Sequence, residues 1–267
     1  MTPGSSAGLR LPPADVVALT ALAWVAAAAL HEGVGHGLAC TALGGHPSNW
    51  STFHFGCDPQ AMSLWGRRIV AGAGTAVNVI LAALGWLVWR GSGALRGRLA
   101  GWIVFAINGL TTFGYLVFSA VFGIGDWNGR GVMTGVTDPV LARVAPAVIG
   151  IAGYYAVVRL AAGMLSRMLN GEGVAAQARR CAVIVWMTTG AISLAAALAA
   201  GSDWRSTIGA SIGVALGGNA GLFSMGRFVK PTAAASTTTL PPSWLLRMAA
   251  ILGTVAFVAI LGPGIAL

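Results

Sequence analysis

The chain has 267 residues, of which 56% are hydrophobic and only 9% are charged. An ordinary soluble domain carries charge at about a quarter of its positions, so this composition excludes a water-soluble globular protein. The net charge of +9 comes from basic residues scattered between apolar runs rather than gathered on one face. We therefore expect no nucleic-acid partner and interpret the basic residues as topology signals.

Taken in chain order, the apolar runs that are long enough to cross a bilayer number seven. They cover about 16–43, 67–89, 99–124, 144–166, 181–200, 207–226 and 244–264. The sixth is rich in Gly and Ser, which is compatible with a tightly packed or re-entrant helix. The sequence predicts an all-α polytopic membrane bundle of six to seven transmembrane helices, with the lipid bilayer of the cell membrane as its surroundings.

The connections between these runs are short, and none is long enough to fold alone. If all seven runs span, basic residues are about twice as frequent in the connections on the N-terminal side, which favours a cytoplasmic N-terminus. Cys40, Cys57 and Cys181 are an odd number of cysteines without a CxxC spacing. They indicate neither a disulfide framework nor a thiolate zinc site, so we expect them to have no role.

Ionisable residues inside a membrane helix are costly and therefore mark candidate functional sites. The first apolar run contains Glu32 between His31 and His36. Imidazoles are zinc ligands, and an adjacent glutamate can deprotonate a water that the metal has acidified, which is the chemistry of the HExxH motif. Here the second histidine comes one position later, and a regular α-helix would rotate it about 140° away from the first. A π-bulge at Gly33 and Gly35 would restore a shared face.

The HExxxH spacing also occurs in the soluble zinc peptidase family of dipeptidyl peptidase III, a resemblance of six residues that implies compatibility with zinc hydrolysis and not a shared fold. Two further strings resemble the site-2 protease family of intramembrane zinc metalloproteases. Residues 73–78 (Ala-Gly-Thr-Ala-Val-Asn) resemble that family's Ala-Gly-Pro-x-x-Asn, with Thr75 in place of proline. Residues 125–130 resemble its Leu-Asp-Gly segment, although Trp-Asn separates Asp126 from Gly129.

The second resemblance covers residues 16–130 and implies that His31, His36 and Asp126 hold a zinc ion, while Glu32 is the general base and Asn78 handles substrate. His46 and His54 remain rival third ligands in the loop after the first helix. Other readings stay open from the residues alone. His31, Glu32 and His36 could form a structural polar network. Asp126 could pair with Arg130, and Asn78 could make an interhelical hydrogen bond.

Asn108, in the third run, is expected to be structural. We divide the chain into residues 1–140, a metalloprotease core of three transmembrane helices, and residues 141–267, additional transmembrane helices of unknown role. The expected function is zinc-dependent hydrolysis of peptide bonds in membrane-protein substrates, and the sequence gives no oligomeric state. The alternatives are a transporter or sensor of metal ions or protons, and a zinc hydrolase that cuts lipid amides. A transporter should distribute ionisable residues along a path through several helices.

Overall fold

The computed structural model describes residues 11–60, 62–169, 173–200, 204–230 and 240–267. Within them, seven helices are long and apolar enough to cross a membrane, which confirms the predicted all-α polytopic bundle. These spans are Pro13–Ala42, Leu64–Gly91, Leu95–Phe122, Val140–Ser166, Val174–Leu198, Thr207–Arg227 and Trp244–Leu261. The helices begin or end within a few residues of the predicted apolar runs, apart from the fifth, which starts earlier.

The first span is one continuous helix made of three pieces. It comprises α1 (Pro13–Ala29), the π-helix η1 (Leu30–Gly37) and α2 (Leu38–Ala42). Proline is well suited to the first turn of α1, where a missing N–H leaves no bond unmade. The wider turn of η1 falls on the glycine-rich stretch around Glu32, as the HExxxH spacing predicts.

The second and third spans are the regular helices α3 (Leu64–Gly91) and α4 (Leu95–Phe122). The Ser63 hydroxyl caps α3 by accepting a hydrogen bond from the Gly66 N–H. Helix α4 ends at Gly123, whose positive φ of 68° is readily adopted by glycine. Helix α3 packs against both η1 and α4, so these three helices enclose the polar residues of the first span.

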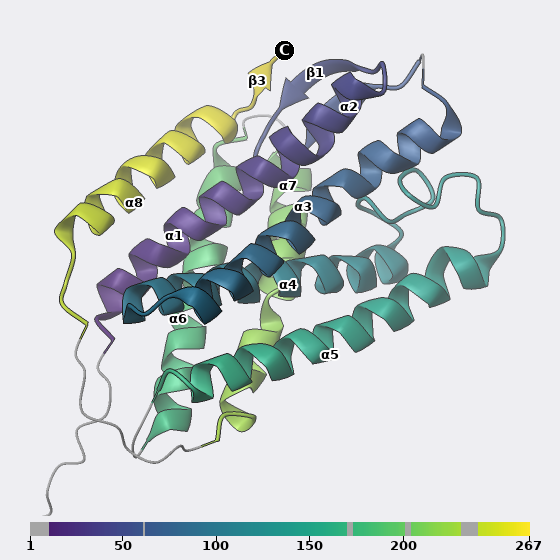
Figure 1. Ribbon diagram of the computed structural model, residues 1–267. Coiled ribbons are helices and arrows are strands. Elements are labelled where there is room, and N and C mark those ends of the chain that lie inside the picture. The colour runs from purple at the N-terminus through teal and green to yellow at the C-terminus, as the bar shows by residue number, and fades with distance from the viewer. Residues whose placement is uncertain (1–10, 61, 170–172, 201–203, 231–239) are drawn as a thin grey trace, which may run out of the picture.

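The later spans surround this core. They contain η2 (Val140–Val144), α5 (Ala145–Ser166), α6 (Val174–Leu198), α7 (Trp204–Ser211), η4 (Ile212–Gly217), η5 (Ala220–Arg227), α8 (Trp244–Ala256) and η6 (Phe257–Leu261). The sixth span changes from α-helix through π-helix η4 to 3-10 helix η5, in keeping with its glycine content. Helix α1 packs against α6 and α8, and Figure 1 shows α8 lying along α1.

A small sheet caps the end of the bundle at which the first span finishes. Strand β1 (His46–Trp50) pairs antiparallel with β2 (Phe55–Asp58) and with β3 (Ile265–Ala266), in the order β2-β1-β3. Figure 1 shows β3, near the C-terminus, beside β1. These strands were not predicted, because they are too short to show a periodic pattern in the sequence.

The cysteines at this end correct an expectation. Cys40 of α2 and Cys57 of β2 form a disulfide, so the prediction that they have no role was wrong. Their separation of 17 residues contains the β1–β2 hairpin, which brings the second cysteine back to the first. The remaining Cys181 is free and buried in α6.

The opposite end of the bundle is held together by Asp15. This carboxylate is fully buried, and its oxygens lie 2.8 Å from Arg247 Nε and 3.4 Å from Arg96 Nη2. The Ser243 N–H also donates to it. The cluster therefore links the first turns of α1, α4 and α8.

Candidate metal centre

The π-helix brings the two histidines onto one face of the first span. The Nε2 atoms of His31 and His36 lie 3.3 Å apart, although five positions separate them in the sequence. The predicted π-helical distortion is therefore confirmed. The Nδ1 atom of His36 lies 2.7 Å from the Val70 carbonyl of α3. Because a carbonyl only accepts, Nδ1 carries the proton, and Nε2 is left with the lone pair that a metal needs.

The loop after α4 brings Asp126 to the same place. Its Oδ2 atom lies 3.5 Å from His31 Nε2 and 3.4 Å from His36 Nε2. Burial alone would raise the pKa of Asp126, but the interactions with the two imidazoles outweigh burial and lower it below its usual value. Among the residues with described positions, the ion pairs of Asp126 are with these histidines and not with Arg130.

The Nε2 atoms of His31 and His36 and the Oδ2 atom of Asp126 have the spacing of metal ligands. His31, Glu32 and His36 form a group whose ligand atoms all lie within 4.8 Å of one another and that could hold a metal ion. The triangle formed by the two Nε2 atoms and Asp126 Oδ2 has sides of 3.3, 3.4 and 3.5 Å. Ligands at about 2.0–2.1 Å from a tetrahedral zinc ion are separated by about 3.3 Å. The donor set therefore has the chemistry and the spacing of a metal site.

Helix α3 leaves room beside the imidazoles because it has a glycine there. A Cβ atom at Gly74 would lie 2.5 Å from His31 Nε2 and 2.6 Å from His36 Nε2. The backbones of α3 and η1 also approach closely here, since a Cβ atom at Gly35 would lie 2.6 Å from the Gly74 Cα. Gly74 belongs to the string of residues 73–78, and no function was predicted for it, although the glycine of that string was the available signal.

The residue after Asp126 fixes the loop to α3. The Trp127 indole donates a hydrogen bond of 2.9 Å to the Thr75 hydroxyl, one residue beyond Gly74. The Asn128 carboxamide oxygen accepts from the N–H groups of Arg130 and Gly131, which closes the turn. The loop that carries Asp126 is therefore attached to the same part of α3 that faces the histidines.

Two cavities meet at Glu32. The narrow cavity, of about 60 Å³, is largely apolar and lies inside the bundle. The wide cavity, of about 540 Å³, is more polar and includes Asp126, His54 and Arg130. Glu32, Phe53 and Tyr115 line both cavities. The carboxylate of the proposed base thus lies between a polar and an apolar compartment.

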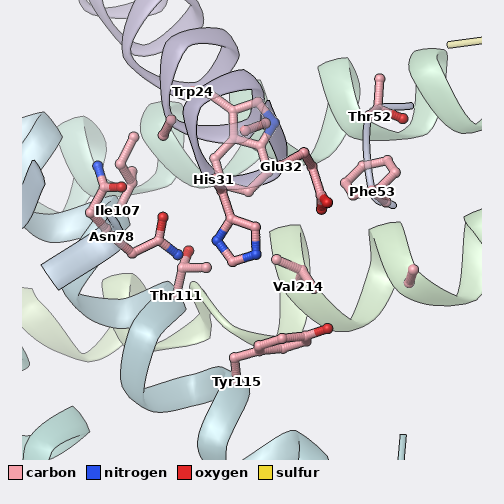
Figure 2. A pocket seen from close by; sticks show the side chains of 14 residues that line it. Trp24, His31, Glu32, Thr52, Phe53, Asn78, Ile107, Thr111, Tyr115 and Val214 are labelled. Atoms are coloured by element: carbon pink, nitrogen blue, oxygen red, sulfur yellow. The ribbon is translucent and has the colours of Figure 1, made fainter. Parts of the chain in front are cut away.

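The narrow cavity contains the other expected site residue in α3. Asn78 lines it together with His31, and Figure 2 shows Asn78 on one side of His31 with Glu32 on the other. Of the rival ligands, His54 lines the wide cavity, whereas His46 lies exposed on β1. Asp126, rather than either of them, lies next to both imidazoles in the described structure. Tyr115, which lines both cavities, had no recognisable signal in the sequence.

Fold and site together define a polytopic membrane protein with a buried His-Glu-His group that could hold a metal ion. No protein-family model, curated protein or solved structure matches the chain. The resemblance to the site-2 protease family therefore rests on the sequence strings quoted above.

Proposed function

We propose that the chain is an intramembrane zinc metalloprotease that hydrolyses peptide bonds of membrane-protein substrates. The observation that carries the proposal is the triangle of His31, His36 and Asp126, whose sides match the ligand spacing of a tetrahedral zinc ion. Two imidazoles and one carboxylate are a ligand set found in catalytic zinc sites, which keep a fourth position open. Glu32 is then free to act as a base.

Zinc, when bound, supplies Lewis-acid polarisation of the scissile carbonyl and of the attacking water. Glu32 accepts a proton from that water and delivers it to the leaving amine. Its place between the two cavities suits this work, because water can enter from the wide cavity while substrate lies in the narrow one. Asn78, which lines the narrow cavity, orients the substrate beside His31.

The distribution of carboxylates favours a single site over a transport path. Among the described residues, the acidic side chains within the membrane spans are Asp15 and Glu32. Asp15 is already engaged by Arg96 and Arg247 at the far end of the bundle. A chain of exchangeable carboxylates across the membrane, which ion transport would need, is not present in this part of the molecule.

The proposal is tested by comparing the wild-type protein with Glu32→Gln, which keeps the side-chain shape and removes the base. Each is reconstituted with detergent-extracted membrane proteins, and new peptide termini are identified by mass spectrometry. We expect termini within hydrophobic segments for the wild type only. Identical termini with both proteins would contradict the proposal. Release of fatty acids from amide lipids without new peptide termini would assign the site to a lipid amide hydrolase instead.

A further inference from the structure

The narrow cavity is bordered by polar atoms that lack partners. The Trp24 indole nitrogen, the Thr52 hydroxyl and the Asn108 carboxamide oxygen are buried and have no hydrogen-bond partner among the described residues. All three residues line this cavity, and none is more than 4% exposed. Buried polar groups are paired as a rule, and leaving them unpaired is costly inside a membrane. Three such groups around one cavity indicate that the cavity binds a polar occupant.

The chemistry of the three groups specifies that occupant. Asn108 Nδ2 donates to the Val104 carbonyl over 2.9 Å, so the nitrogen must face that carbonyl and Oδ1 remains as a free acceptor. The indole nitrogen of Trp24 can only donate. These two unpaired groups therefore offer one donor and one acceptor, the complement of the C=O and N–H of an amide. The Thr52 hydroxyl can serve either group.

The size of the cavity agrees with this assignment. A water molecule needs roughly 10–15 Å³ of cavity volume. A cavity of about 60 Å³ therefore holds about four non-hydrogen atoms. One peptide unit with a small substituent is of that size. The walls also include the apolar residues Ala27, Ala28, Ile107 and Val214. Figure 2 shows Trp24, Glu32 and Thr52 along one side of the cavity and Thr111, Val214 and Tyr115 along the other.

We propose that the narrow cavity is a subsite that binds one backbone amide of the substrate next to the scissile bond. This inference rests on the proposed protease function, since His31 and Glu32 line the same cavity. A transmembrane helix must lose backbone hydrogen bonds before a peptide bond can be attacked, and those groups need new partners at membrane depth. Trp24 and Asn108 supply them, so the subsite stabilises the unwound segment.

The subsite also gives the later helices a part in the site. Thr52 lies in the β1–β2 hairpin, and its N–H donates to the Leu261 carbonyl at the end of η6. Ala210 of α7 and Val214 of η4 complete the wall. Helices α7 and η4 thus close a compartment that the first three spans leave open.

The test uses conservative variants that each remove one unpaired group: Trp24→Phe, Thr52→Val and Asn108→Leu. Trp89→Phe and Ser193→Ala are matched controls, because Trp89 Nε1 and Ser193 Oγ are also buried without described partners but do not line the cavity. Dissociation constants are measured by calorimetry on the zinc-supplemented protein in detergent. The probes are N-acetyl-dialanine hydroxamate, N-acetyl-dialanine amide and acetohydroxamate.

We expect each cavity variant to weaken binding of both dialanine probes about fivefold, the effect of one hydrogen bond. The cavity variants should not change the binding of acetohydroxamate, which reports on the metal alone. The two control variants should not change the binding of any of the three probes. Dialanine binding that is equal in wild type and cavity variants, or undetectable in wild type, would overturn the subsite while leaving a metal-dependent protease possible. If wild-type protein does not bind acetohydroxamate, the zinc site is overturned instead. The dialanine amide, which has no hydroxamate group, would still test the subsite in that case.

Discussion

The Trp127 indole donates a hydrogen bond of 2.9 Å to the Thr75 hydroxyl, and this contact joins two of the three places where the chain departs from the site-2 protease pattern. Thr75 replaces the proline of the family string, and Trp127 belongs to the pair inserted between Asp126 and Gly129. The inserted residue therefore has its partner on α3, and the carboxylate before it is placed against the histidines.

This contact predicts energetic coupling between Thr75 and Trp127. Thr75→Val and Trp127→Phe should each weaken metal binding, because each removes the bond that holds the Asp126 loop. The double variant should bind metal no more weakly than the more affected single variant. This corresponds to a coupling energy of about 1 kcal/mol. Competition with a chelator measures the affinities. Strictly additive losses would show that the contact does not position the loop.

Gly74→Ala should abolish metal binding and leave the helix intact. The added methyl group would lie 2.5 Å from His31 Nε2, in the space that the ion needs. Helix propensity alone would make the change favourable by about 1 kcal/mol, so loss of binding cannot come from a weakened α3. Gly72→Ala is the matched control, since a Cβ there meets only Val132 at 3.4 Å. Equal zinc content in Gly74→Ala and Gly72→Ala would contradict the close approach of Gly74 to the two histidines.

Asp15→Asn should destabilise the bundle without changing the metal centre. The substitution leaves Arg96 and Arg247 without their buried counter-charge. Because both arginines are about one-third exposed, at 35% and 38%, we expect a loss of about 1–3 kcal/mol rather than the full cost of a buried pair. Denaturant titration of the detergent-solubilised protein measures it. An unchanged unfolding midpoint would show that the cluster does not stabilise the bundle. Loss of zinc from the Asp15→Asn variant would show that the cluster is not purely structural.

The spans were predictable because each is a long apolar run, and hydropathy alone locates such runs. The π-helix was predictable for a different reason: His31 and His36 can share one ion only if the helix widens between them. The strands and the disulfide were not, since β1 and β2 are short and their pairing depends on the turn that returns Cys57 to Cys40. Asn108 was expected to be structural, and its unpaired oxygen becomes visible only once the cavity is known.

The disulfide makes a prediction about orientation. Disulfides persist in oxidising compartments, and the bias in basic residues favours a cytoplasmic N-terminus, so both observations favour a hairpin end outside the cytoplasm. In intact cells, an impermeant reductant followed by an impermeant maleimide should label Cys57, which lines the wide cavity. Ser92→Cys, at the other end of the bundle in a variant without native cysteines, should be labelled only after permeabilisation. The reverse labelling pattern would show that the protein has the opposite orientation in the membrane.

In the proposed mechanism, His31, His36 and Asp126 hold a zinc ion while Glu32 stays free to move protons. Zinc content of the purified, detergent-solubilised protein tests it most directly, with His31→Ala, His36→Ala, Asp126→Ala and Glu32→Gln compared with wild type. We predict about one zinc per chain in wild type and Glu32→Gln, and loss of zinc in the three ligand variants. Wild-type protein without zinc after metal supplementation would contradict the mechanism, and zinc retained without Asp126 would move the third ligand to His54 or His46.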